Sequence, residues 1–419
     1  MLERALKVIP LGAQTFSKSL TQYPLGASPF FIARAAGSRA WDVDGNEYVD
    51  FNNALASVTL GHADPDVTAA VTDQIGRGTI FSLSSEIEIA VAEAIVAAVP
   101  CAEQVRFGKN GSDATAGAIR AARAFTGRER VAVCGYHGWQ DWYIGTTARS
   151  KGVPEATRAL SHSFPYNDAA ALEALLSAHP GEFAAVIIEP MNIAWPEPGY
   201  LEAVAKLTRA HGAVLVFDET ITGFRYALGG AQQLFGVTPD LCCLGKGLAN
   251  GYPLAAVAGR RDIMAEFEQV FFSFTMGGET LSLAAAQAAI AKGVEQDVAG
   301  RLQSLGKSLI AGVEDLIAKH DCGDFLAIAG HPSWTFLTIA EATDARGFEL
   351  KTLYLQEVLA RGILTLGTHN LSFAMGDEEL ARLFATYDEV FPLLREARAA
   401  GDILQRLRCE PLQPLFKVR

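Results

Sequence analysis

Acidic and basic residues follow two short apolar runs, at points where a buried strand would end. Asp218-Glu219 follows residues 213–217, and Lys246 follows residues 241–244 between two glycines. A buried carboxylate is unfavourable without a partner. A protonated ring nitrogen of a ligand is one such partner, and a helix cap or a salt bridge is the alternative. Desolvation lowers the pKa of an amine and makes it nucleophilic, although a lysine at the rim of a sheet can also be simply hydrated.

Two other apolar runs are followed by groups that could hold a phosphorylated aromatic ligand. Asn110–Ser112 follows residues 105–107 and opens a helical pattern. Backbone N–H groups and the positive helix end would converge on an anion there, and a simple N-cap is the alternative. Tyr136-His137 follows residues 131–134, and an aromatic ring there could stack on a planar ligand or pack in the core. Together with the lysine and the carboxylate, these are the groups that a pyridoxal 5′-phosphate (PLP) enzyme needs.

These motifs belong to a segment in which short apolar runs alternate with helical patterns. Such alternation predicts an α/β fold with a mainly parallel sheet covered by helices, and ligands bind at the carboxyl ends of the strands in such sheets. The expected strands are residues 105–107, 131–134, 185–188, 213–217, 241–244 and 254–258. The expected helices are residues 65–76, 86–99, 112–125, 200–211, 263–267 and 281–292.

Both ends of the chain carry further secondary-structure patterns. Asp44-Gly45-Asn46 lies between two alternating runs and predicts a β-hairpin over residues 40–51. We therefore expect a large PLP-binding domain over residues 61–300 and a small α+β domain built from residues 1–60 and 301–419. After residue 300, the expected helices are residues 302–319, 350–361 and 377–397, and the expected strands are residues 325–328 and 334–339.

The composition is that of a globular protein with an acidic surface. Half of the 419 residues are hydrophobic, and 35 basic against 47 acidic residues give a net charge of −12. This charge argues against general binding to nucleic acid or to an anionic membrane. The six cysteines form no CxxC pair, so we expect reduced thiols and no metal site. The first residues do not resemble a signal peptide, and no run of about 18 apolar residues could span a bilayer. We expect a cytoplasmic protein.

Longer stretches of the sequence resemble the class III, fold type I, PLP-dependent aminotransferases, in particular the branch of glutamate-1-semialdehyde 2,1-aminomutase. The similarity extends over nearly the whole chain. It rests on the stretches DVDGNEYVDF, LGHADP, FGKNGSDATAGAIRAARAFTGR, YHGWQD, IIEP, VFDETITGFR, LGKGLANGYPLAAVAGRRDIM and FTMGGETLSLAAAQA. The resemblance implies the fold type I architecture, a homodimer with shared active sites, and a small-molecule amino donor and carbonyl acceptor as partners.

The resemblance also implies roles for the residues at the strand ends. Lys246 would form the Schiff base with PLP and shuttle a proton, and Asp218 would keep the pyridine nitrogen protonated. Tyr136 would stack on the ring, accompanied by His137. The other implied cofactor contacts are Asn110, Gly111 and Ser112 at the phosphate, Glu189 at the preceding strand end, and Thr275, which would reach the phosphate of the neighbouring subunit.

The sequence departs from the aminomutase branch where the substrate should bind. Lys18 stands where that branch has an arginine for the substrate carboxylate, and lysine lacks the bidentate fork of arginine. Gly367 falls near the position of a C-terminal glutamate, which leaves His369 and Asn370 as nearby polar groups for the substrate. His369 could equally be a satisfied polar residue of the small domain. The GNP that follows the family's threonine is replaced by Gly-Glu-Thr at residues 278–280.

These departures favour an aminotransferase that moves an amino group between a donor and a small polar or anionic aldehyde or ketone, in two half-reactions with ping-pong kinetics. The aminomutase itself, which transfers the amino group within one molecule, is the second hypothesis. A PLP-fold protein kept for binding is the third, and the intact Lys246 and Asp218 argue against it. Epimerase or lyase chemistry stays open because PLP stabilises the carbanion in every case.

Overall fold

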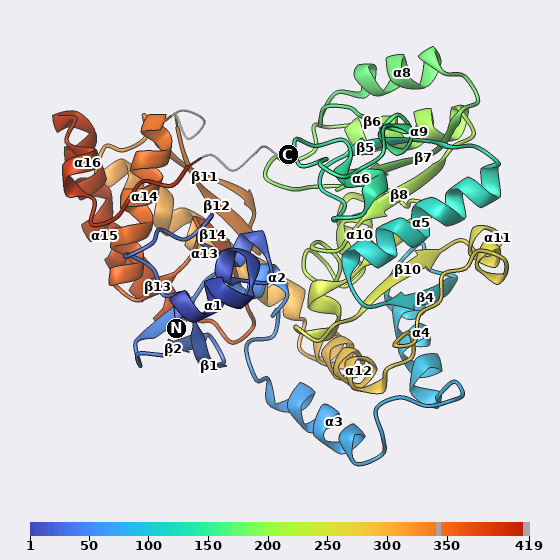
Figure 1. Cartoon of the computed structure of the whole chain (residues 1–419), viewed down its shortest axis with the longest axis horizontal. Helices are drawn as coiled ribbons and strands as arrows, with labels where there is room; N and C mark the ends of the chain where they lie inside the picture. The colour runs from blue at the N-terminus through green and yellow to red at the C-terminus, as the bar shows by residue number, and fades with distance from the viewer. Residues whose placement is uncertain (341–344, 414–419) are drawn as a thin grey trace. The chain divides into compact units, whose positions relative to one another are not determined.

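The structure is a computed structural model that describes residues 1–340 and 345–413 (Figure 1). The chain divides into two compact units. The large unit is Pro65–Gly300, and the small unit combines Met1–Asp64 with the described residues from Arg301 onward. Among the described helices, none has both the length and the hydropathy needed to cross a membrane.

The large unit is built around a mixed, mainly parallel sheet. Its strand order is β4-β10-β9-β8-β7-β5-β6. β10 runs antiparallel to both of its neighbours, whereas the pairs from β9 to β6 are parallel. The mainly parallel sheet expected from the sequence is confirmed. The strands are β4 (Gln104–Gly108), β5 (Arg130–Cys134), β6 (Ser161–Ser163), β7 (Phe183–Ile188), β8 (Val214–Asp218), β9 (Leu241–Leu244) and β10 (Ala255–Gly259).

Helices cover both faces of this sheet, with α5 on one side and α8 and α9 on the other (Figure 1). The longer helices are α3 (Pro65–Ile75), α4 (Glu86–Ala98), α5 (Gly111–Thr126), α8 (Ala169–Ala178), α9 (Tyr200–Ala210) and α12 (Thr280–Glu295). The shorter ones are α6 (Asp141–Ile144), α7 (Glu155–Arg158), α10 (Gly230–Phe235), η3 (Lys246–Ala249), α11 (Arg261–Met264) and η4 (Ala265–Glu268).

The alternation of side chains along each strand creates a separate hydrophobic core on each face. In β7, Ala185 and Ile187 pack in the core that contains α5, and Val186 and Ile188 pack in the core that contains α8 and α9. All six residues of β7 are buried. This is why the central strands have continuous apolar sequences and why polar residues first occur where the strands end.

The small unit contains two sheets and several long helices. β1 (Ile32–Ala36), β2 (Arg39–Asp42), β3 (Glu47–Asp50) and β13 (Ile363–Leu364) form one sheet, in which β2 and β3 make the expected hairpin. β11 (Leu326–His331), β12 (Trp334–Ile339) and β14 (Thr368–Asn370) form the other. The helices are α1 (Leu2–Val8), η1 (Pro10–Gly12), η2 (Phe16–Lys18), α2 (Asn53–Ala56), α13 (Val298–Lys319, which begins just before the boundary of the unit), α14 (Ala345–Ala360), α15 (Asp377–Ala400) and α16 (Ile403–Arg406).

Candidate active site

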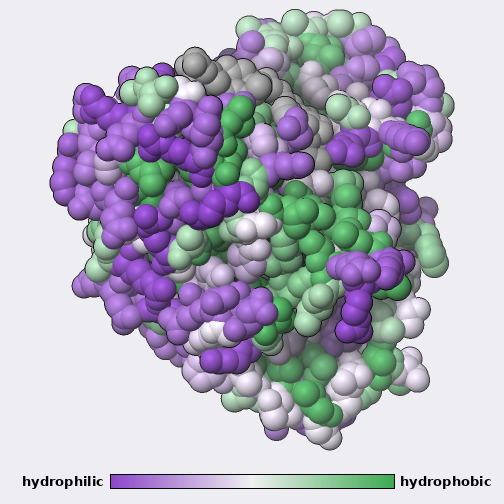
Figure 2. Space-filling model, turned by 60° about the vertical axis from the view of Figure 1, so that its left-hand side comes forward, coloured by the Kyte–Doolittle hydropathy of each residue, from purple (hydrophilic) through white to green (hydrophobic). Residues whose placement is uncertain are grey.

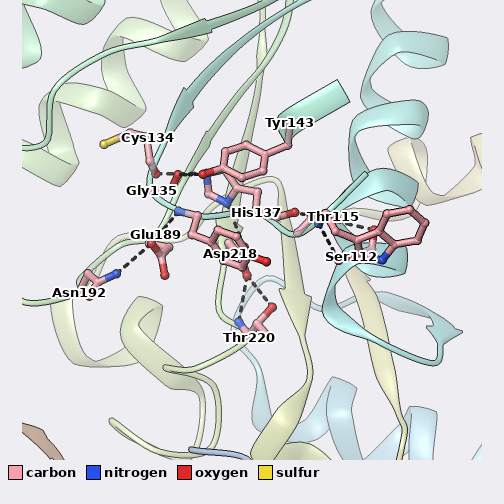
Figure 3. A network of polar contacts seen from close by, with 12 residues as sticks. Ser112, Thr115, Cys134, Gly135, His137, Tyr143, Glu189, Asn192, Asp218 and Thr220 are labelled. Atoms are coloured by element: carbon pink, nitrogen blue, oxygen red, sulfur yellow. Dashed lines mark hydrogen bonds and ion pairs between the residues drawn. The ribbon is translucent and has the colours of Figure 1, made fainter. Parts of the chain in front are cut away.

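The candidate site lies at the carboxyl edge of the parallel strands β5, β7, β8 and β9. Tyr136-His137 follows β5, Glu189 follows β7, Asp218 ends β8, and Lys246 follows β9. Because these four strands are adjacent and parallel, their carboxyl ends meet at one edge of the sheet. Figure 3 shows several of these side chains connected by one network of hydrogen bonds.

Asp218 is held by hydrogen bonds to both carboxylate oxygens. Its Oδ1 accepts bonds from the backbone N–H of Thr220 at 3.1 Å and from the Thr220 hydroxyl at 2.6 Å. Its Oδ2 lies 2.9 Å from Nδ1 of His137. The side chains of Asp218 and His137 are 5% and 0% exposed. The partner that a buried carboxylate requires is therefore present before any ligand binds.

The His137 ring is enclosed by aromatic side chains. Trp142 lies almost parallel to it, with an interplanar angle of 13°, and Tyr143 meets it edge-on at a centroid distance of 5.2 Å. The Tyr143 hydroxyl donates to the Gly135 carbonyl at 2.8 Å, and the Thr115 hydroxyl donates to the His137 carbonyl at 2.8 Å. These contacts fix the ring orientation beside Asp218.

Tyr136 points differently from its neighbour His137. Its side chain is 37% exposed, and its ring meets Tyr143 edge-on. Its backbone N–H donates to Glu189 Oε2 at 2.8 Å, and the same oxygen accepts a bond from the Asn192 amide at 3.0 Å. An accessible aromatic ring beside a buried carboxylate favours the stacking interpretation over core packing, and Glu189 positions the backbone that carries the ring.

The N-terminus of α5 forms a cradle bordered by glycines. A Cβ atom on Gly111 would lie 2.9 Å from the Thr220 methyl group, and one on Gly138 would lie 2.2 Å from Ser112 Oγ. The Ser112 hydroxyl accepts a bond from the backbone N–H of Trp139 at 3.2 Å. The first N–H groups of an α-helix have no partner within the helix, so this cradle suits an anion.

The Asn110 side chain is engaged in capping α5. Its Oδ1 accepts from the Asp113 backbone N–H at 3.3 Å, and its Nδ2 donates to Asp113 Oδ2 at 3.0 Å. The N-cap alternative therefore describes the Asn110 side chain, whereas the anion interpretation concerns the first turn of the helix that Asn110 caps.

Lys246 begins η3 directly after β9 and is half-buried. Its φ angle is +47°, a left-handed conformation that non-glycine residues seldom adopt. The preceding residue, Gly245, lies near Gly111 and Thr220, since a Cβ atom on it would be 3.9 Å from the Gly111 Cα and 3.2 Å from the Thr220 methyl group. The chain therefore brings the lysine segment next to both the anion cradle and the residue that binds Asp218.

Glu219, the second acid of the pair, has a structural role. Its carboxylate accepts bonds from the backbone N–H groups of Ala231 at 2.6 Å and Gln232 at 3.1 Å, in the first turn of α10. The Thr222 hydroxyl adds a further bond at 2.7 Å. Complete burial raises the pKa of Glu219 above its ordinary value. A helix cap was one of the roles considered for both Asp218 and Glu219, and the structure shows that role for Glu219.

The remaining residues expected to contact ligands lie elsewhere in the chain. Thr275 is exposed in the connection between η4 and α12. Lys18 is exposed at the end of η2 in the small unit. His369 is fully buried in β14, with Nδ1 bonded to the Thr335 hydroxyl and Nε2 bonded to the Tyr387 hydroxyl. This arrangement favours the packing interpretation of His369 over a substrate contact.

Asn370, next to His369, is also buried within the small unit. Its Nδ2 donates to the Asn52 carbonyl at 2.7 Å, and its backbone carbonyl accepts from the Asn53 amide. Its side chain therefore connects β14 to the start of α2. In the described residues, no group of three His, Cys, Asp or Glu side chains is placed to hold a metal ion.

Several residues of the network were not expected from the sequence. Thr220, Thr115, Tyr143 and Trp139 contact the candidate residues through a hydroxyl, a ring edge or a backbone N–H. The position of Thr220 two residues after a strand-ending aspartate is one signal that was available, because a threonine there can donate back to the carboxylate. The other three depend on how the loop after β5 folds.

Known proteins define the class of this fold and site. A FumI protein from Sphingopyxis sp. MTA144, solved in its PLP internal aldimine form, is 30% identical with a TM-score of 0.88, and the match covers 98% of this chain and 97% of that one. This similarity and the sheet-edge site define a fold type I PLP enzyme.

Sequence comparisons identify the family. The model described as Aminotransferase class-III matches residues 23–375. Glutamate-1-semialdehyde 2,1-aminomutase of Roseiflexus castenholzii is 40% identical, covering 76% of this chain and 78% of the relative. The 3-aminobutyryl-CoA aminotransferase of Cloacimonas acidaminovorans is 33% identical, covering 91% and 93%. The chain belongs to the class III aminotransferase family, uses PLP, and acts on small-molecule amino donors and acceptors.

The residues present fit PLP. Gly111 and Gly138 allow the loops to pack closely around the first turn of α5, because a Cβ atom on either would lie within 3 Å of Thr220 or Ser112, and the first N–H groups of that turn suit a phosphate. Asp218 is oriented and buried as a partner for a ring nitrogen. Tyr136 offers an accessible ring, and Lys246 supplies an amine from the adjacent strand end.

Proposed function

We propose that this protein is an intermolecular aminotransferase in which Lys246 binds PLP covalently and Asp218 holds the proton on its pyridine nitrogen. The observation that carries the proposal is the meeting of the Asp218–His137 pair, the α5 cradle and the Lys246 segment at one edge of the sheet. Bound PLP supplies an aldehyde that condenses with amines and a ring that stabilises negative charge on the substrate carbon.

We assign the remaining roles residue by residue. The Lys246 ε-amine would hold the cofactor and, when free, would carry the proton to and from the substrate carbon. The N–H groups at the start of α5, with Ser112, bind the phosphate. Tyr136 stacks on the ring, and Glu189 holds the Tyr136 backbone in place through its 2.8 Å hydrogen bond.

Borohydride reduction tests the covalent role of Lys246. The holoenzyme should retain PLP after reduction and denaturation, and peptide mass spectrometry should place the adduct on Lys246. Lys246→Ala should lose the adduct and reduce turnover by about 10²- to 10⁴-fold. Lys109, which pairs with Glu279 at 2.9 Å, provides a control, because Lys109→Ala should keep the adduct on Lys246. An adduct on another lysine, or none, would refute the assignment.

We further propose that the carbonyl substrate is a small polar or anionic aldehyde or ketone. Support comes from the exposed Lys18, which attracts an anion without the bidentate geometry of arginine. The resemblance adds that the glutamate of the aminomutase branch falls near Gly367, where this chain has no carboxylate. Lys18→Met should raise KM for anionic substrates and leave KM for neutral ones unchanged. An equal effect on both would remove Lys18 from the substrate site.

Glutamate-1-semialdehyde aminomutase is the second candidate, because one relative with that name is 40% identical. The two candidates differ in whether an external carbonyl acceptor is needed. Incubation with glutamate-1-semialdehyde alone should give no 5-aminolevulinate if our first proposal is correct. Bleaching of the yellow holoenzyme by an amino donor excludes a protein kept only for binding.

We propose a homodimer in which Thr275 reaches the neighbouring active site. Large apolar side chains remain exposed near the α3–α4 connection and in the segment before Thr275. Figure 2 shows that hydrophobic surface is exposed on the side of the molecule that it draws. These side chains are Ile75, Ile80, Phe81, Leu83, Ile89 and Phe271, the last of them 81% exposed. Light scattering should give twice the chain mass.

We also propose a cytoplasmic location, which the six free cysteines support.

A further inference from the structure

Lys109 and Glu279 form an ion pair next to the α5 cradle. Lys109 connects β4 to Asn110, the residue that caps α5, and Glu279 is the residue that caps α12. The Lys109 Nζ lies 2.9 Å from Glu279 Oε2, and the two side chains are 17% and 18% exposed. This contact between residues 170 positions apart in the sequence therefore joins the turn that opens α5 to the start of a second helix.

Both partners of the ion pair are also bonded to the first turn of a helix. Glu279 Oε1 accepts from the backbone N–H of Leu281 at 2.7 Å, and Oε2 accepts from the Ser282 hydroxyl at 2.6 Å. The backbone N–H of Lys109 donates to Asp113 Oδ2 at 2.9 Å. Burial raises the pKa of Glu279, but the hydrogen bonds from Lys109 and α12 outweigh burial and hold that pKa below its ordinary value. Because the carboxylate is fixed and little of either side chain is exposed, the pair holds two segments together more firmly than a surface ion pair does.

The segment that leads into α12 is held by contacts to β4 and α5. Thr275 lies in this segment, between η4 and α12. The Phe271 carbonyl accepts a hydrogen bond from Arg120 of α5 at 3.1 Å. The Phe272 carbonyl accepts one from Arg106 of β4 at 3.3 Å. These bonds hold the chain before Thr275, and the ion pair holds it after Thr275.

We propose that Lys109 and Glu279 are positioning residues that fix the segment carrying Thr275 relative to the phosphate-binding turn of α5. The inference deepens the proposed function and rests on it, because Thr275 and the first turn of α5 are groups to which we assign the phosphate. Glu279 stands in the Gly-Glu-Thr stretch that replaces GNP. The middle residue of GNP is an uncharged asparagine, so the ion pair depends on the residues of this chain.

A positioning role and a purely electrostatic role predict different effects. Loss of either partner frees the start of α12 from the turn before Asn110, so the groups assigned to the phosphate no longer share one fixed arrangement. Charge alone would act in opposite directions: without Lys109 the Glu279 carboxylate would repel the phosphate, and without Glu279 the lysine would attract it. Both substitutions should therefore weaken phosphate binding if the pair acts by positioning.

Binding of PLP and of pyridoxal to the apoprotein tests this role, because pyridoxal has the aldehyde and the ring but lacks the phosphate. Lys109→Met removes the charge, and Glu279→Gln keeps an oxygen that can accept from the N–H groups of α12. We expect each variant to bind PLP about threefold to tenfold more weakly and to bind pyridoxal as the wild type does. The double variant should lose no more affinity than either single variant, because the interaction is already absent.

Another ion pair on the same helix provides the control. Lys292 of α12 lies 2.7 Å from Asp66 of α3, at the opposite end of α12 from Glu279. Lys292→Met should leave the affinities for PLP and for pyridoxal unchanged. Three results would overturn the proposal: wild-type PLP affinity in Lys109→Met and Glu279→Gln, equal losses for PLP and pyridoxal, or opposite shifts in the two variants.

The two proposals fail in different ways. With PLP in excess, both variants should still carry the borohydride adduct on Lys246, because the ion pair changes affinity and not the aldehyde chemistry. An adduct missing from the wild type refutes the proposed function. In that case, calorimetry of inorganic phosphate binding to the apoprotein still tests the ion pair, since both variants should bind phosphate more weakly than the wild type. An adduct on Lys246 together with unchanged PLP affinity in both variants refutes the positioning role alone.

Discussion

Replacing His369 should change how the stability of the small unit depends on pH. The ring is completely buried, and its nitrogens are bonded to the hydroxyls of Thr335 at 2.8 Å and Tyr387 at 2.7 Å. The Tyr387 hydroxyl is in turn 2.7 Å from the hydroxyl of Tyr354. Burial lowers the pKa of His369 from 6.5 to about 3, so the ring stays neutral in the folded protein at all physiological pH values.

The direction of the effect follows from proton binding by the two states. Below about pH 6.5, the unfolded chain takes up a proton at this residue, and the folded chain does not do so until about pH 3. The free energy of unfolding therefore decreases as the pH falls through this window. With these two pKa values, His369 alone removes about 2 kcal/mol between about pH 7 and about pH 5.

Urea unfolding of wild type and His369→Gln at these two pH values, with PLP kept saturating, measures this loss. The wild type should lose about 2 kcal/mol more than the variant on acidification, whatever the stability of the variant at neutral pH. Thr335→Val provides the control: it removes a hydrogen bond but keeps the titrating ring, so it should retain the wild-type pH dependence. Equal losses in wild type and His369→Gln would show that the ring is not held neutral.

Two further substitutions test the glycine cradle and a strained turn. Gly138→Ala should weaken PLP binding by about tenfold or more, because the new Cβ would lie 2.2 Å from Ser112 Oγ. Gly181→Ala, at φ +76° with no atom within 4 Å of the new Cβ, should leave PLP binding unchanged; equal weakening would contradict the steric argument. Ala54 has a φ angle of +50° in a left-handed turn. Ala54→Gly should leave the free energy of unfolding unchanged or raise it slightly, because relief of about 1 kcal/mol of backbone strain offsets the larger conformational entropy of glycine in the unfolded chain. In urea unfolding, Ala385→Gly in the middle of α15 should instead cost about 1 kcal/mol, and a similar loss at position 54 would argue against strain.

The sheet of the large unit could be predicted because its strands are buried on both faces. Continuous apolar runs such as residues 185–188 correspond to β7, in which every residue is buried. The antiparallel direction of β10 could not be predicted, because a fully buried strand has no period that reveals its direction. β6 was also missed, since Ser161–Ser163 is short and polar and is a strand only through its pairing with β5.

The site could be predicted to the extent that it depends on strand ends. A polar residue directly after a buried run, such as Asp218, lies at the edge of the sheet whatever the loops do. Contacts made by loops could not be predicted in the same way. The bond from the Trp139 backbone N–H to Ser112 Oγ requires the path of the loop after β5, and the burial of His369 requires β12 and α15 to pack on β14.

Asp218 and Glu219 are adjacent acids at the end of β8, but they have different partners and therefore different roles. Both carboxylates follow the same apolar run, but consecutive side chains at a strand end point to opposite sides. Asp218 meets an imidazole and a hydroxyl at the ligand edge. Glu219 meets backbone N–H groups of α10 and is completely buried. Glu219 accepts hydrogen bonds from the first turn of α10 and from Thr222 and therefore stabilises a helix terminus, whereas Asp218 is the acid to which our proposal assigns the pyridine nitrogen. The two residue types alone therefore do not reveal the roles of Asp218 and Glu219. Those roles depend on the direction in which each side chain leaves the end of β8.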